Sequence, residues 1–356
     1  MRDGKLSEPI FKRSVLRQLN MKCRGQAVSA DDGMSGAAAG AAATTATTAT
    51  TATAAVPAGI GRDAGIIRLY GDNFLAAASC AYTVHSQKAA WYAVCCAANR
   101  VAAAGAKPTA VMLSVLLPED FEEKDLKAMM CTVKTACTQL HIEPAGADIE
   151  VSPSVNAPVF QTTAYGSLDR QTMDRLCGAK AGQDLVVTKQ IGLEGTAILA
   201  AEQEEKLLKR YTEAFIYQAQ AFSEYASVLN EAAAALKHGA TAMHTIQQGG
   251  ILGALWELAE ASGAGLEADL KKIPIKQETV EICEFFTYNP YQLLSGGSLL
   301  IAAEDGFGLV RALEREHIPA AVIGRLTDGN DRVILKDDER RFIELPQMDE
   351  IWKRRD

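Results

Sequence analysis

The sequence predicts an α/β (α+β) protein built from two domains, and three observations support this prediction. Strand-like and helix-like stretches alternate in both halves of the chain, which is the pattern of layered α/β folds. The 356 residues suffice for two domains of ordinary size, and 48% hydrophobic residues can fill two cores. The composition changes over residues 168–182, where we place the domain boundary.

The chain begins with an amphipathic stretch and a low-complexity insertion. Residues 36–57 consist almost entirely of Ala, Thr and Gly, so they offer little apolar area to offset ordering entropy, and we expect no fixed structure there. The run also lacks the Leu, Ile and Phe of a membrane span. Before it, residues 8–20 place five apolar residues on one helical face: Ile10, Phe11, Val15, Leu16 and Leu19.

Strands and helices then alternate up to the boundary. The predicted order is a glycine turn, a short strand and a second turn (59–73), a largely apolar helix stopped by Gly105 and Pro108 (86–108), a β-rich run (109–119), a helix opening with Glu119 and Asp120, and a turn-rich stretch running into a strand (145–166).

The C-terminal half repeats this alternation. The predicted order is a strand, a glycine loop and a helix start (184–202), a long Ala- and Glu-rich helical region (202–238), a glycine turn into an amphipathic helix (244–265), the segment 270–286, a glycine turn into a buried strand (293–304), and helix, turn and strand (307–326). The resulting division is an N-terminal segment (1–35), the insertion (36–57), two domains (58–170 and 171–345) and a tail (346–356).

Composition excludes several classes of function. The net charge of -8 and the pI near 5.3 argue against a nucleic-acid binder, which needs a basic face. The eight cysteines contain no CxxC pair, and their spacing fits neither a zinc site nor a disulfide framework. We therefore expect a reducing, cytoplasmic setting with no membrane association, and the charged first 24 residues are not a signal peptide.

The residues leave the functional motifs open between two interpretations. Gly249 and Gly250 precede an amphipathic helix whose N-terminus could bind phosphate, but a tight turn packed against another backbone is the interpretation that the residues alone favour. His244 could be a base or a structural hydrogen-bonding residue. Lys189 and Glu194 bracket a glycine loop and could contact an anion and a metal or form a solvated pair, and Asp63 could bind Mg²⁺ or merely form a turn.

Several longer motifs resemble the AIR synthase-related (PurM-like) superfamily, and within it the HypE family of hydrogenase expression/formation proteins. The resemblance covers nearly the whole chain outside the insertion. It rests on these stretches: "GIGRDAG", "ANRVAAAGAKPTAVMLSVLLPE", "EVSPSVNAPVFQTTAYG", "LVVTKQIGLEGTAILA", "GGILGALWELAEASGAGL", "IPIKQETVEICEFF" and "LLSGGSLLIA".

The resemblance implies ATP and Mg²⁺ bound in a cleft between an N-terminal domain that forms a homodimer and a C-terminal α/β domain. It also implies maturation proteins as partners. Asp63 is then the candidate metal ligand and His244 the candidate catalytic residue. The positions expected to bind the cofactor are Gly61, Asp63, Asn99, Glu150, Lys189, Gly249 and Gly250.

The chain departs from the family pattern at the acids that hold Mg²⁺. The stretch Gly146–Glu150 also lacks the usual His, and the chain ends in "MDEIWKRRD" without the terminal Cys that the hydrogenase branch carries. A cation in place of an acid competes with Mg²⁺ for phosphate. The residues that stand where acids are expected are Arg62, Cys80, Arg100, Thr245 and Gln248.

Three functional hypotheses follow. The first is a degenerate homologue that keeps the fold and dimer with a weakened or lost ATP–Mg²⁺ site. The second is an active ATP-dependent enzyme of hydrogenase maturation, for which Asp63, Asn99, Glu150 and His244 suffice. The third is a non-catalytic dimeric binding or regulatory subunit. The missing acids favour the first.

Overall fold

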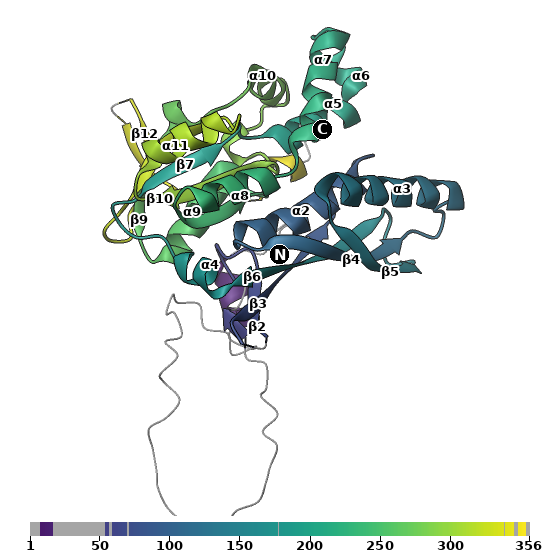
Figure 1. Cartoon of the computed structure of the whole chain (residues 1–356). Coiled ribbons are helices and arrows are strands. Elements are labelled where there is room, and N and C mark those ends of the chain that lie inside the picture. The colour runs from purple at the N-terminus through teal and green to yellow at the C-terminus, as the bar shows by residue number, and fades with distance from the viewer. Residues whose placement is uncertain are drawn as a thin grey trace, which may run out of the picture.

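The computed structural model describes residues 8–16, 54–56, 59–69, 71–176, 178–337, 339–344 and 348–353. These residues form two sheet-based domains that pack against each other, with helix α2 between them (Figure 1). The α/β class predicted from the sequence is confirmed. Both sheets are mixed and mostly antiparallel, with parallel pairs only at β4–β5 and β9–β12 among the described strands.

The N-terminal domain is a six-stranded sheet in the order β1-β2-β3-β6-β4-β5, with α2 and α3 on one face (Figure 1). Residues of β3, β4 and β6 alternate between buried and more exposed positions, as expected when one face of a sheet is covered. The bounds are β1 Ala54–Val56, β2 Gly65–Arg68, β3 Asn73–Tyr82, α2 Ala89–Ala103, β4 Lys107–Leu117, α3 Glu123–Leu140, β5 Glu143–Val151, β6 Val159–Asp169 and α4 Arg170–Arg175.

Helix α2 connects the two domains. Twelve of its fifteen residues are buried, so it is enclosed on all sides, as its nearly uniform apolar sequence predicts. One side packs on β3 and β6 of its own sheet, and the other contacts β8 and α8 of the C-terminal domain. Side chains of α2 are therefore available to a site between the domains.

The C-terminal domain is a seven-stranded sheet in the order β13-β12-β9-β11-β7-β10-β8. Successive residues of β7 face opposite layers: Leu185 and Val187 pack with α9, whereas Val186 packs with α8 and α11. The bounds are β7 Asp184–Thr188, α5 Leu193–Glu202, α6 Glu204–Leu207, α7 Glu213–Gln220, η2 Ala221–Tyr225, α8 Leu229–Lys237, β8 Ala240–Ile246, α9 Gly250–Ser262, β9 Gly265–Asp269, η3 Leu270–Lys272, α10 Gln277–Phe286, η4 Pro290–Gln292, β10 Ser298–Ala303, α11 Gly306–Arg315, β11 Ala320–Thr327, β12 Arg332–Lys336, β13 Glu339–Phe342 and η5 Glu350–Trp352.

The helical region predicted over 202–238 consists of four short helices, α6, α7, η2 and α8. The structure corrects two local predictions. Residues 54–56, which we assigned to the insertion, form β1 and pair with β2; the rest of the insertion lies outside the described residues. Residues 143–151 form edge strand β5 where we expected turns. The N-terminal helix is seen over residues 8–16, as α1 (Glu8–Phe11) and η1 (Lys12–Leu16). Within the described residues, no helix combines the length and apolar character needed to cross a bilayer.

Candidate functional site

A buried cluster of charged and polar side chains lies where the two domains meet. We call it the interdomain cluster, and it consists of Asp63, Arg100, His244, Thr245 and Glu257. The turn before β2 supplies Asp63, the last turn of α2 supplies Arg100, β8 supplies His244 and Thr245, and α9 supplies Glu257. Apart from Arg100, every member is more than nine-tenths buried.

His244 joins two carboxylates across the domain boundary. Its Nδ1 lies 2.8 Å from Asp63 Oδ2, and its Nε2 lies 3.0 Å from Glu257 Oε2. Burial alone disfavours a charged imidazole, but the charges and hydrogen bonds of Asp63 and Glu257 outweigh this effect and raise the pKa of His244 to about 9. His244 is therefore a protonated imidazolium that donates from both nitrogens, and a protonated imidazole cannot accept a proton as a general base.

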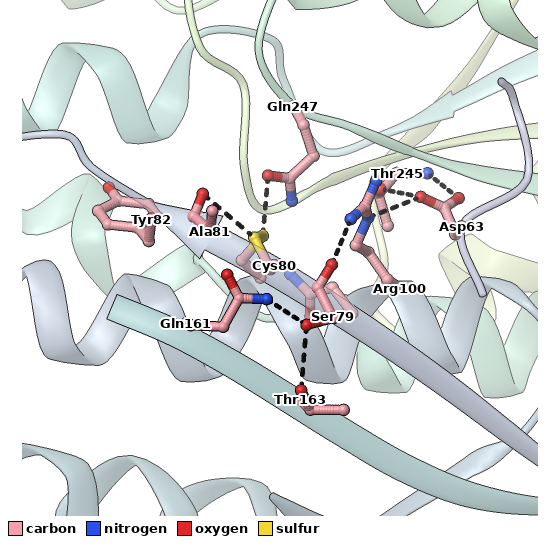
Figure 2. Close-up of a disulfide and its surroundings, with 12 residues drawn as sticks. Asp63, Ser79, Cys80, Ala81, Tyr82, Arg100, Gln161, Thr163, Thr245 and Gln247 are labelled. Atoms are coloured by element: carbon pink, nitrogen blue, oxygen red, sulfur yellow. Dashed lines mark hydrogen bonds and ion pairs between the residues drawn. A yellow bond between two sulfur atoms is a disulfide. The ribbon is translucent and has the colours of Figure 1, made fainter. Parts of the chain in front are cut away.

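Asp63 has both oxygens engaged. Thr245 donates its backbone N–H to Oδ2 at 3.0 Å and its hydroxyl to Oδ1 at 2.6 Å, and Arg100 Nε lies 3.5 Å from Oδ1 (Figure 2). Burial by itself would raise the pKa of Asp63, but His244, Arg100 and Thr245 together hold it well below its usual range. The carboxylate is ionised, and its lone pairs are directed at protein donors.

Gly61 allows the turn that carries Asp63 to dock on α9. Its φ is +68°, and a Cβ at this position would come within 2.0 Å of the Glu257 carbonyl oxygen. Only glycine tolerates both the left-handed backbone and the close approach. Gly61 thus positions Asp63 beside His244.

The N-terminus of α9 is occupied by a carboxylate of the chain itself. Asp349, from the C-terminal segment, accepts the Gly249 N–H at 2.6 Å with Oδ2 and the Leu294 N–H at 3.1 Å with Oδ1. Gly250 packs as the residue-based interpretation predicted, because a Cβ there would lie 2.5 Å from the Tyr291 carbonyl oxygen. Burial raises the pKa of Asp349 to about 6 in spite of these hydrogen bonds. Asp349 therefore holds the place that an anionic ligand would take at this helix.

Asn99 and Lys189 hold the same backbone segment. The Asn99 amide donates to the Ala226 carbonyl at 2.7 Å and accepts from the Val228 N–H at 2.9 Å. Lys189 Nζ lies 2.8 Å from Glu231 Oε1 and donates to two further carbonyl oxygens, of Tyr225 and Ser227. Both candidate cofactor residues are thus fully engaged in fixing the segment between η2 and α8.

Glu150 stands apart from the interdomain cluster. It lies exposed on edge strand β5, which is separated from β3 by β4 and β6. Within one chain the structure therefore does not bring Glu150 together with Asp63.

A further buried carboxyl, outside the interdomain cluster, lies between the domains at Glu194, in the first turn of α5. Tyr82 donates its hydroxyl to Glu194 Oε1 at 2.6 Å, and a Cβ on Gly296 would overlap Glu194 Oε2. Burial raises the pKa of Glu194 to about 7, with the Tyr82 hydrogen bond acting in the opposite direction. The two domains thus bury ionisable groups at two places along their contact.

The structure also corrects the prediction that the cysteines form no disulfide. Cys80 of β3 and Cys96 of α2 are joined by a disulfide beside the interdomain cluster (Figure 2). Their spacing of 16 residues matches no framework pattern, so only the packing of α2 on β3 brings them together.

Sequence reasoning missed Glu257 and Asp349 as members of this region. A signal existed for Glu257, because it is an acid on the mostly buried helix α9 and such a residue needs a partner. For Asp349 no local signal existed, since its partner Gly249 is 100 residues away.

Comparisons with known proteins match both domains. Residues 61–168 match the N-terminal domain of AIR synthase related proteins, and residues 180–336 match the C-terminal domain. The chain belongs to the AIR synthase related family. The predicted fold and family are thereby confirmed.

Relatives of this AIR synthase related chain include hydrogenase maturation proteins. A putative hydrogenase expression/formation protein of Methanocaldococcus jannaschii is 29% identical over 71% of this chain and 75% of its own length. The carbamoyl dehydratase HypE of Cupriavidus necator is 26% identical over 69% of this chain and 67% of its own length. A thiamine-monophosphate kinase of Halobacterium salinarum is 26% identical over 70% of this chain and 80% of its own length.

Solved structures share the fold. HypE in a HypE–HypF complex gives a TM-score of 0.67 at 20% identity, covering 81% of this chain and 94% of that one. HypE in complex with ATP gives a TM-score of 0.66 at 19% identity, covering 80% of this chain and 88% of that one. A ThiL protein complexed with AMPPCP and TMP gives a TM-score of 0.62 at 23% identity, covering 79% of this chain and 90% of that one.

Proposed function

We propose that this chain is a HypE-like member of the family that keeps the nucleotide-site scaffold but has lost efficient ATP–Mg²⁺ turnover. The observation that carries the proposal is the state of Asp63. Both of its oxygens are held by Thr245, His244 and Arg100, so the remaining acid of the expected metal site is committed to the protein.

The donor set does not fit Mg²⁺. This ion requires oxygen ligands in near-octahedral geometry and is usually held by one or two carboxylates plus phosphates. Asp63 is flanked by a guanidinium and an imidazolium, which repel a cation, and Glu257 is bound to His244. Nor do the described residues contain a group of three or more His, Cys, Asp or Glu side chains arranged to hold a metal.

Nucleotide phosphates meet a different obstacle. The α9 N-terminus is the element of the cluster region suited to an anion, and Asp349 already accepts its Gly249 N–H. Arg100 is a quarter exposed and could contribute a charge-assisted hydrogen bond. Phosphate binding at this helix thus requires that the Asp349 carboxylate leave, so we expect ATP to bind weakly and without a requirement for metal.

A dimeric binding or regulatory role is the second candidate, because the N-terminal sheet has an exposed apolar face. Met112 of β4 is 48% exposed, the Tyr165 hydroxyl of β6 lies 3.8 Å from its sulfur, and Gln161 and Thr163 on the same face of β6 are uncharged. Apolar side chains grouped on an open sheet face are typical of an interface. We propose that this face forms a homodimer with two-fold symmetry. By analogy with HypE bound to HypF, a maturation protein is the proposed further partner.

Titration calorimetry separates these functions. We expect no Mg²⁺-dependent ATP binding and no hydrolysis above buffer. Restoring the acids together, as Arg62→Glu, Cys80→Asp, Arg100→Asp, Thr245→Asp and Gln248→Glu, should recover Mg²⁺-dependent ATP binding. The matched control introduces the uncharged amides instead and leaves Gln248 unchanged. It carries Arg62→Gln, Cys80→Asn, Arg100→Asn and Thr245→Asn, and it should show no Mg²⁺-dependent ATP binding.

Three outcomes decide the proposal. Robust Mg²⁺-dependent ATPase activity of the unmodified chain would overturn it and establish the active maturation enzyme. Tight ATP binding in EDTA, lost on Arg100→Ala, would replace it with a metal-free nucleotide site. For the dimer, sedimentation velocity at micromolar concentration should show two copies, and Met112→Lys should yield monomers; a wild-type monomer would exclude this interface.

A further inference from the structure

The Cys80–Cys96 disulfide lies at the point where the two domains touch. It connects β3 to α2 with a Cα–Cα distance of 6.6 Å, within the range that a disulfide spans. Cys96 Sγ lies 3.3 Å from Gln247 Oε1, in the turn between β8 and α9 (Figure 2). Both cysteines are more than nine-tenths buried, so the C-terminal domain helps to cover the sulfur atoms.

The disulfide is one of two adjacent links between α2 and β3. Arg100 follows Cys96 by one helical turn, and its Nη1 donates to the Ser79 carbonyl at 3.1 Å. Ser79 and Cys80 are consecutive in β3, so both links hold the same end of α2 to the same part of the strand. Through Arg100, this part of the fold is coupled to Asp63 and thereby to His244.

The neighbouring cysteine has a different environment. Cys95 is only 1% exposed, and burial, reinforced by the charge of Glu194, raises its pKa well above the ordinary value. A thiol that does not ionise is a poor nucleophile. Among the free cysteines that the structure describes, Cys131 alone is exposed. Among the described cysteines, Cys80 and Cys96 are the two that are joined to each other, so reversible disulfide chemistry within the chain involves this pair.

We propose that Cys80 and Cys96 form a reversible redox pair that controls how firmly the two domains are held together around Gln247. In the oxidised form, the disulfide fixes α2 on β3 and supports the Arg100–Ser79 link. In the reduced form, that covalent link is absent, and the contact between α2 and the 244–250 segment loosens. This inference does not depend on whether the chain binds a nucleotide.

The exchange partner is a small-molecule thiol or disulfide of the glutathione class. One cysteine thiolate attacks a sulfur of the oxidised partner, releases one partner thiol and forms a mixed disulfide. The second cysteine thiolate then attacks the protein sulfur of that mixed disulfide and releases the second partner thiol. Two protein thiols and one partner disulfide thereby give one protein disulfide and two partner thiols, so atoms and electrons balance.

Differential alkylation of the full chain tests the chemistry. The protein is equilibrated with glutathione disulfide or with dithiothreitol, and free thiols are then labelled under denaturing conditions and located by peptide mass spectrometry. Cys80 and Cys96 should be blocked after oxidation and labelled after reduction, whereas Cys131 should be labelled after dithiothreitol treatment and remain outside any intramolecular bond. Labelling of Cys80 and Cys96 after oxidation would overturn the proposal.

Hydrogen–deuterium exchange tests the structural consequence. Reduction should speed exchange severalfold in peptides covering 244–250 and 59–64, and it should lower the Tm by about 5 °C, as expected for a disulfide that closes a loop of this length. Cys96→Ser should resemble the reduced protein and lose the response to oxidant, and Cys131→Ser should respond as wild type. Equal exchange at 244–250 in both states of the wild-type protein refutes the switch even if the serine variant does not fold.

Discussion

His244 and Asp63 form a buried ion pair, 2.8 Å between Nδ1 and Oδ2, that joins strand β8 of one domain to the turn before β2 of the other. The two residues are 181 positions apart in the chain. In this pair, an acid expected to bind metal and a histidine expected to act in catalysis neutralise each other. The pair is a contact that holds the two domains together.

Removing the Asp63 charge should destabilise the protein strongly. Asp63→Asn leaves the imidazolium of His244 with one carboxylate instead of two in a buried site, and we expect the free energy of unfolding to fall by about 3 kcal/mol. Urea denaturation followed by circular dichroism measures the change. Asp72→Asn, at an exposed position, is the matched control and should change stability by less than about 0.5 kcal/mol. Equal stability of the two variants would show that the ion pair contributes nothing.

The raised pKa of His244 predicts a pH-dependent stability above neutrality. The folded pKa of about 9 exceeds the ordinary histidine pKa of 6.5, so the contribution of His244 to stability is fully present below pH 6.5 and is lost as the pH rises through 9. A pKa shift of this size contributes about 3 kcal/mol to the free energy of unfolding. Urea unfolding at pH 6 and pH 9.5 should show this loss, and His244→Gln should flatten it. His85→Gln, at a largely exposed side chain, should keep the wild-type slope; a slope unchanged in His244→Gln assigns the pH dependence elsewhere.

Glu194 predicts a second pH range, more acidic than that of His244, in which the stability of the protein changes. Its folded pKa of about 7 lies above the ordinary glutamate pKa of 4.5, so its contribution to stability is fully present below pH 4.5 and decreases as the pH rises through 7. Glu194→Gln keeps the size and the hydrogen bond to Tyr82 but cannot ionise. We therefore expect this variant to be more stable than wild type at pH 7.5 and to lose the slope between pH 4.5 and 7. Thermal unfolding across this range checks it, and a wild-type slope in the variant contradicts the assignment.

The sequence predicted the fold better than the site, and particular residues show why. The alternating burial along β3, β4 and β6 follows from the order of neighbouring residues in the sequence, so these strands could be predicted. Edge strand β5 is exposed along nearly its whole length and contains Pro144 and Gly146, so no periodicity marked it. The family resemblance placed Asp63 and His244 near one cleft, but their hydrogen bonding to each other depends on how the domains dock.

The Asp349 carboxylate at the α9 N-terminus provides the last prediction. Asp349→Ala removes the acceptor of the Gly249 and Leu294 N–H groups and should lower the free energy of unfolding by about 1 kcal/mol, as loss of a helix cap does. It also exposes N–H groups that favour anions, so binding of ATP in EDTA should tighten at least severalfold. Asp305→Ala is the matched control, because Asp305 caps α11 through the Gly308 N–H away from this site. The control should lose similar stability without gaining affinity. If both variants bind ATP as weakly as wild type, Asp349 is a structural cap and does not compete with phosphate at this helix.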